Sequence, residues 1–189
     1  MQDQVQQCWE IETAPIRAPS QADAKAALSV LKDMAKGHDR IASLLASDGP
    51  FKTFVVAAFA LSPFLRDTGD SRPAILEELL STDLTAFLTE RVRRARDAWK
   101  PNEGGAALPD TEIMARLRRA KRELAFAVAL ADLSRHFDGR ETTRWLSDFA
   151  GAAVSATIDH LLLSAHESGK LIVKDVANPS IGSGVIVLG

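Results

Sequence analysis

One stretch decides the fold: residues 110–136 read DTEIMARLRRAKRELAFAVALADLSRH. Apolar residues recur in it at intervals of three and four, the period of an α-helix with one buried face. From Leu124 to Leu133 apolar residues occur on every side, which is typical of a helix at the centre of a bundle. At 1.5 Å per residue this helix is roughly 40 Å long. We therefore predict a mainly α protein built around it.

A second long helix is predicted directly after the first, over residues 140–168. It carries an apolar stripe that includes Trp145, Leu146 and Phe149. Before it, an aspartate at position 138 and a glutamate at position 141 have the spacing of a capping box, which marks a helix start. Two long helices joined by a tight turn form an antiparallel hairpin, and we expect one here.

Shorter helices are expected upstream, beginning with a second capping-box candidate at Ser20 and Asp23. They are predicted from Ser20 to about Gly37, around Ile41–Leu45, and over residues 51–61, 72–80 and 83–99. Ser62-Pro63 is expected to bend or end the third of them. The fold class predicted is a multi-helix bundle of about six or seven helices.

The helical pattern stops at Gly169. Leu171–Val173 and Val185–Leu188 are short apolar runs, and the second is rich in β-branched residues, as buried strands are. No other segment is a comparable strand, so we expect a short C-terminal β tail that opens a truncated domain. The predicted division is an irregular N-terminal arm (1–19), a helical bundle (20–168), and a linker with a first strand (169–189).

The composition is that of an ordinary soluble globular protein. The chain has 189 residues, 46% of them hydrophobic, and a net charge of −2, a balance that makes no case for nucleic-acid binding. The longest apolar run, Phe54–Leu61, is far shorter than the roughly 20 residues that span a bilayer. Because a signal-peptide pattern is also missing, we expect a cytoplasmic protein. The single cysteine, Cys8, allows no intrachain disulfide and no thiolate zinc cluster.

The strongest local feature is the basic run RLRRAKRE at residues 116–123. Its five cations lie outside the apolar stripe of the helix. They could form a solvated face with ion pairs at helical spacing, between Arg116 and Glu112 and between Arg119 and Glu123. They could instead dock an acidic neighbouring domain or phosphate groups. A weaker basic cluster comprises Arg91, Arg93, Arg94 and Arg96.

Two titratable residues fall within apolar surroundings. Asp132 lies in the apolar half of the central helix, so we expect it to be paired or hydrogen-bonded, with a structural ion pair favoured over a catalytic acid or base. His160 falls on the stripe of Trp145 and Phe149 and is expected to be a buried core histidine. No metal-binding histidine pair occurs in the sequence. We predict no catalytic, cofactor-binding or metal-binding residue in this chain.

Several segments, taken in order, carry a family resemblance. They are LSPFL at 61–65, LEELL at 76–80, RLRRAKRE at 116–123, LSDFA at 146–150 and GVIVLG at 184–189. Together they resemble the bifunctional glutamine synthetase adenylyltransferase/adenylyl-removing enzymes. The resemblance covers about residues 60–189.

The resemblance implies a parent nucleotidyltransferase that uses ATP and magnesium to transfer AMP to glutamine synthetase and removes it by phosphorolysis. It implies glutamine synthetase and a PII signalling protein as partners in nitrogen regulation. In the family the terminal strand leads into a glycine- and lysine-containing loop and a Ser-Asp-x-Asp segment that holds the metal ions. None of these residues follows the strand here.

On this resemblance the chain is the N-terminal helical part of such an enzyme. It should be inactive alone, because two-metal nucleotidyl transfer needs carboxylates that fix the ions. Arg118, Arg119, Arg122 and Glu123 are predicted to dock against the absent downstream nucleotidyltransferase domain.

Two alternatives stay open from the residues alone. The chain could be an autonomous helical protein-interaction module whose tail pairs with the sheet edge of a partner. It could also be a basic-helix nucleic-acid binder, whose affinity would fall steeply with salt.

Overall fold

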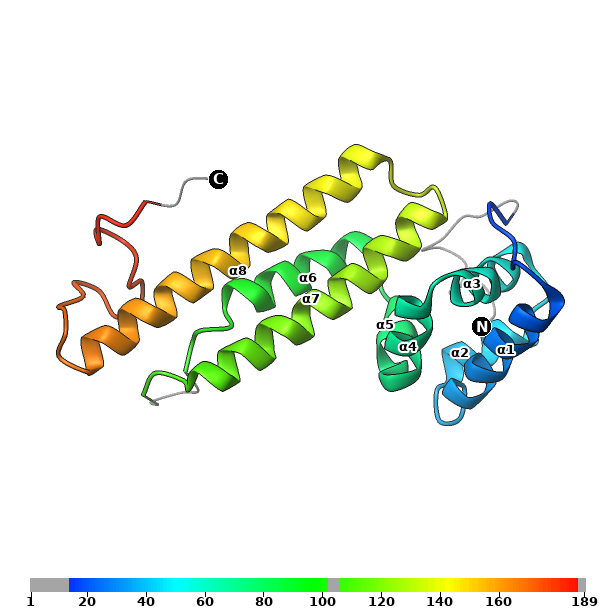
Figure 1. Cartoon of the computed structure of the whole chain (residues 1–189), viewed down its shortest axis with the longest axis horizontal. Coiled ribbons are helices and arrows are strands. Elements are labelled where there is room, and N and C mark those ends of the chain that lie inside the picture. The colour runs from blue at the N-terminus through cyan, green and yellow to red at the C-terminus, as the bar shows by residue number, and fades with distance from the viewer. Residues whose placement is uncertain (1–13, 102–105, 187–189) are drawn as a thin grey trace. The chain divides into compact units, whose positions relative to one another are not determined.

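A computed structural model describes residues 14–101 and 106–186, and this part of the chain is mainly helical (Figure 1). Its helices are α1 (Gln21–Met34), α2 (Asp39–Ala46), α3 (Pro50–Leu61), α4 (Pro63–Ser71), α5 (Pro73–Leu79), α6 (Leu84–Arg96), α7 (Asp110–Leu133) and α8 (Gly139–Glu167). The described residues contain no β-strand. The predicted mainly α class is confirmed.

Both capping-box candidates begin helices. The Ser20 side chain accepts a hydrogen bond from the backbone N–H of Asp23 at the start of α1. Before α8, Asp138 Oδ1 accepts from the Glu141 N–H at 2.8 Å, and Glu141 accepts from the Asp138 N–H at 3.2 Å. Such caps satisfy N–H groups that the first helical turn leaves without partners.

Helix α4 was missing from the sequence-based prediction, which ended the third helix at Ser62-Pro63 and resumed at Arg72. Ser62 ends α3 and also begins α4, because its side chain accepts from the Leu65 N–H at 3.3 Å. Proline at the first helical position loses no hydrogen bond and is favoured there. The Ser-Pro pair therefore marked a helix start as well as a helix end.

The described residues cluster into two compact units, and α6, α7 and α8 each contribute residues to both. The first unit contains residues 14–89 and 122–145, and the second contains 90–101, 106–121 and 146–186. The division predicted from sequence, at residues 19/20 and 168/169, stays a prediction.

The core of the first unit is built around aromatic side chains. Phe59 of α3 and Phe126 of α7 are fully buried and meet edge to face, with ring centroids 6.2 Å apart. Gly69 of α4 lies directly against the Phe59 ring. The apolar half of α7 is therefore a core helix of this unit, as the sequence predicts.

The second unit has its own apolar core. Its members come from the turn that follows α6, from α7 and from α8: Ala98, Trp99, Ile113, Ala156 and Leu163. Leu117 packs against this cluster from α7.

The C-terminal segment is irregular over its described residues, 168–186. Leu171–Val173 does not form the expected β-like run, because the described residues provide no strand with which it could pair. Of the expected strand Val185–Leu188, the first two residues are irregular, while the rest lie outside the described residues, as do Cys8 and most of the N-terminal arm.

Among the residues that the structure describes, no single helix has the length and hydropathy to cross a membrane. Only α2 and α3 together, bent by 110° at their junction, meet that test on length and composition.

Candidate functional site: the basic face of α7

The basic run lies on α7, where Arg118, Arg119, Lys121 and Arg122 are exposed. We call these four side chains the α7 cations. None of them forms an ion pair or a side-chain hydrogen bond with any residue of the described chain. The cluster is therefore a concentration of positive charge without carboxylate partners among the described residues.

One of the two ion pairs expected for a solvated face is present. Arg116 Nε donates to Glu112 Oε1 at 2.8 Å, and Arg116 Nη1 donates to the Lys100 carbonyl at 3.0 Å. Arg116 therefore links α7 to the backbone of the segment that precedes this helix. This pair was predicted, and it is confirmed.

The expected pair between Arg119 and Glu123 was wrong. Glu123 is only 8% exposed, and its Oε1 lies 3.8 Å from Arg72 Nη1. A carboxylate that becomes buried needs a compensating charge, and tertiary packing supplies Arg72. Of the four predicted docking residues, three arginines lie on the surface and Glu123 lies inside.

The α7 cations repel one another. Arg118 is four residues from Arg122 and three from Lys121, and Arg119 is three residues from Arg122. Like charges at these helical spacings each destabilise a helix by about 0.2–0.5 kcal/mol. A partner that brings carboxylates to this face would relieve the repulsion.

The basic cluster of α6 behaves differently because it holds its own carboxylates. Glu90 accepts hydrogen bonds from Arg93 and from Arg94, each at 2.8 Å or less. These hydrogen bonds lower the pKa of Glu90 from 4.5 to about 2. Arg93 also pairs with Asp97 at 3.0 Å. The paired arginines of this cluster therefore do not resemble the α7 cations.

Replacing Glu90 by glutamine should remove a contribution to stability that depends on pH. Because folding lowers the pKa of Glu90, this contribution is present above about pH 4.5 and is lost as the pH falls toward 2. Solvent screens these partly exposed groups, so we expect a loss of about 1 kcal/mol or less at neutral pH. Urea unfolding of both proteins at several pH values should show this difference shrinking with acidification.

The matched control is Asp70→Asn, which removes an exposed carboxylate from α4. Its effect on the free energy of unfolding should be small, as is usual for substitutions at exposed positions. An equal effect of Glu90→Gln and Asp70→Asn across this range would contradict the role assigned to Glu90.

His160 is the buried core histidine that the sequence predicts. It is 2% exposed, and its Nε2 lies 2.7 Å from Asp110 Oδ1, a hydrogen bond in which the ring N–H donates to the carboxylate. The bond ties the first residue of α7 to α8. His160 therefore has a packing role within the second unit.

Asp132 is exposed, so the expectation of a buried structural ion pair was wrong. Its Oδ1 accepts a hydrogen bond from the Thr142 hydroxyl at 3.2 Å. Among residues 124–133 of α7, Asp132 is the exposed position, one residue before the helix ends at Leu133. A hydroxyl group is therefore a sufficient partner for this carboxylate.

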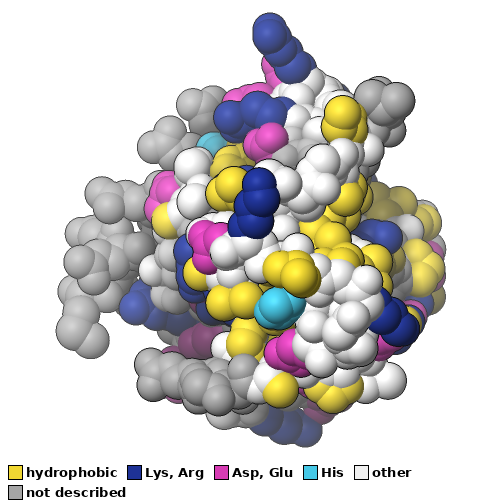
Figure 2. Space-filling view, turned by 90° about the vertical axis from the view of Figure 1, so that its left-hand side faces the viewer, with side chains coloured by type: hydrophobic (Ala, Val, Ile, Leu, Met, Phe, Trp, Pro, Cys, Tyr) yellow, Lys and Arg dark blue, Asp and Glu magenta, His cyan; other side chains and the backbone are white. Residues whose placement is uncertain are grey.

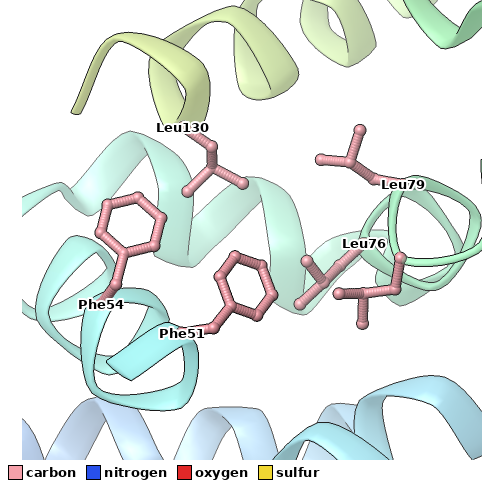
Figure 3. A pocket seen from close by; sticks show the side chains of 6 residues that line it. Phe51, Phe54, Leu76, Leu79 and Leu130 are labelled. Atoms are coloured by element: carbon pink, nitrogen blue, oxygen red, sulfur yellow. The ribbon is translucent and has the colours of Figure 1, made fainter. Parts of the chain in front are cut away.

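An apolar cluster in the first unit is packed core rather than a ligand cavity (Figure 3). Phe51 and Phe54 of α3 point toward Leu76 and Leu79 of α5 and toward Leu130 of α7. The side chains leave no room for a water molecule between them. Elsewhere in the described ranges, no group of three His, Cys, Asp or Glu side chains could hold a metal ion.

Apolar side chains are also exposed on the second unit. On α8 they include Leu146, which is 46% exposed although the sequence placed it on the buried stripe, and also Val154 and Leu161. Figure 2 shows hydrophobic side chains gathered on the face that carries the C-terminal end of α8. Exposed apolar patches rimmed by polar groups mark interaction surfaces.

These features define a class of protein: a helical module with exposed apolar side chains and a basic helix face, whose α7 cations have no carboxylate partners among the described residues. The sequence model of the glutamate-ammonia ligase adenylyltransferase family matches residues 53–189. The chain belongs to this family of nucleotidyltransferases, as its sequence resemblance predicts.

The chain is also similar to proteins named bifunctional glutamine synthetase adenylyltransferase/adenylyl-removing enzyme. It is 71% identical over 180 residues to the one of Rhizobium meliloti (strain 1021) and 52% identical over 180 residues to that of Agrobacterium fabrum. Each alignment covers 95% of this chain but only 18% of the relative. The relative from Mesorhizobium japonicum is 39% identical over 184 residues, 96% of this chain and 18% of its own length. No solved structure matches the chain significantly.

Proposed function

We propose that this chain is the N-terminal helical part of a bifunctional glutamine synthetase adenylyltransferase/adenylyl-removing enzyme. The parent enzyme would use ATP and magnesium in the cytoplasm to transfer AMP to glutamine synthetase and would also remove it, under control of a PII protein. The observation that carries the proposal is the 71% identity to a relative of that name, of which this chain spans 18%. The chain itself supplies a scaffold and leaves catalysis to the nucleotidyltransferase domain.

The α7 cations would provide the docking surface for that domain, with Arg118, Arg119 and Arg122 as the contacts predicted from sequence. Two features support this role: these cations have no carboxylate partners among the described residues, and they repel one another. The exposed apolar side chains of α8 would add contact area, since docked interfaces combine apolar cores with polar rims.

In the parent enzyme α7 and α8 would form an antiparallel hairpin, and residues 185–188 would form the first strand of the next domain. Two contacts favour the hairpin: Asp110 with His160, and Asp132 with Thr142. The first residue of α7 thus contacts the last third of α8, and the last turn of α7 contacts the first turn of α8. Exposed Val185 and Ile186 favour the strand, because a sheet would bury them.

A chimera tests the proposal. The matched region of the Rhizobium meliloti relative is replaced by this chain, and AMP transfer to glutamine synthetase and AMP removal are measured with ATP and magnesium. We expect the chimera to retain both activities, while the purified chain alone turns over no ATP. A folded chimera without either activity, or ATP turnover by the chain alone, would contradict the proposal.

The same chimera tests the α7 cations. Changing Arg118, Arg119 and Arg122 to glutamate should lower the activity at least ~10-fold, since three surface ion pairs of about 0.5 kcal/mol each amount to roughly one decade. The matched control changes Lys25, Lys32 and Lys170, three other exposed cations, to glutamate. Equal losses of activity in both variants would contradict a docking role of the α7 cations.

A further inference from the structure

A groove of about 540 Å³ opens on the first unit between α1 and α3. Its apolar lining comes from Ala24 and Leu28 of α1 and from Val56 and Ala57 of α3. The volume is within the range of roughly 300–1,000 Å³ that is usual for binding pockets. The groove is open to solvent rather than enclosed, so a polypeptide could lie across it and continue beyond both ends.

Two cations, Arg17 and Lys52, and one carboxylate, Asp48, line the groove next to its apolar residues. Arg17 is exposed and has no ion pair or side-chain hydrogen bond with any residue in the described ranges. The Lys52 ammonium donates to the Ser47 carbonyl at 3.0 Å and to Asp48 Oδ1 at 3.2 Å. Since the Asp48 side chain is 99% exposed, water screens this pair, and a third N–H of Lys52 stays available.

The end of the groove at α3 is also electropositive. Gly49 precedes α3 and offers no side chain to cap its first N–H groups. The N-terminal end of a helix carries a partial positive charge. Arg17, Lys52 and this helix end therefore act together next to an apolar surface.

We propose that this groove binds an acidic peptide segment of a partner protein. An apolar side chain of the segment rests on Leu28 and Val56, and a neighbouring carboxylate lies beside Arg17 and Lys52. The groove lining carries two cations against one carboxylate, that of Asp48, and this net positive charge favours an acidic occupant. The apolar lining favours a peptide over a nucleic-acid backbone, which has no apolar group to place there. This goes beyond the proposed function, which assigns no role to α1 or α3.

The test measures binding of a dye-labelled peptide that alternates glutamate with leucine and phenylalanine (ELEFE) to the full chain by fluorescence anisotropy. We expect saturable binding that weakens with salt. Arg17→Glu together with Lys52→Glu should weaken it at least ~10-fold, and so should Val56→Glu, which places a charge on the apolar lining. The peptide with glutamine in place of glutamate should bind more weakly to the unchanged chain.

The matched control is Lys25→Glu, an exposed cation of α1 that does not line the groove, and it should bind the peptide like the unchanged chain. The single variant Arg17→Glu separates a loss of peptide binding from a loss of folding, because Arg17 is exposed and lies outside every described helix. The proposal is overturned if the unchanged chain shows no saturable binding or if the groove variants bind as the control does. It is also overturned if a single-stranded oligothymidine binds the groove as tightly as the peptide.

Discussion

Phe126→Ala should lower the free energy of unfolding by about 3–5 kcal/mol, the usual cost of truncating a buried aromatic side chain. Phe126 is fully buried and meets Phe59 edge to face. The variant loses both the transfer free energy of the ring and its contacts with Phe59, and it leaves a cavity where α7 packs against α3. Urea unfolding followed by circular dichroism measures the change.

Met114→Ala is the matched control for Phe126→Ala, since both residues lie on α7 and Met114 is exposed. Substitutions at exposed positions usually change stability by less than about 0.5 kcal/mol. Comparable losses in the two variants would mean that Phe126 is not a core residue.

Gly69→Ala should destabilise the protein by up to about 2 kcal/mol, although alanine is the better helix former. A Cβ atom at this position would lie 2.7 Å from Phe59 Cζ and 2.8 Å from Phe59 Cε1, inside van der Waals contact. The gain in helix propensity is about 1 kcal/mol, while overpacking a core costs about 1–3 kcal/mol. The steric cost wins because Phe59 is fully buried and cannot move aside. Thermal and urea unfolding should both report the loss.

Gly151→Ala on α8 should have the opposite effect on stability. Apart from the adjacent residues and the nearby backbone of the same helix, no atom lies within 4 Å of the Cβ that alanine would add there. Only the helix-propensity term remains, so this variant should be more stable by about 0.5–1 kcal/mol. If both glycine variants changed stability in the same direction, the close approach of Gly69 to Phe59 would be in doubt.

Much of the fold could be predicted from residues that are close together in the sequence. The caps at Ser20 and Asp138 were predictable because their partners are three positions away, a spacing that a helix turn fixes. The apolar half of α7 was predictable because every side of it is apolar. The sequence-based prediction lacks helix α4, because it treats Ser62-Pro63 as a bend or an end of the preceding helix, although the same pair favours a helix start.

The candidate site was predicted only in part. The basic run on α7 and the pair of Arg116 with Glu112 follow from sequence spacing, and so does the family resemblance. The sequence could not predict that Arg119 has no partner among the described residues. Glu123 is at the right helical spacing from Arg119, but in the fold it lies beside Arg72. The groove between α1 and α3 had no signal in the sequence, since no local pattern relates Arg17 to Lys52.

The amino-acid sequence alone determined where most helices start, which sides of them are apolar and to which family the chain belongs. These properties depend on neighbours within one or two helical turns, where backbone geometry sets the distances. The tertiary structure alone decided that Asp110 meets His160, that Glu123 is buried beside Arg72 and that Leu146 faces solvent. Such contacts depend on how distant helices pack, because packing determines which side chains lose water and which charges remain available for a partner.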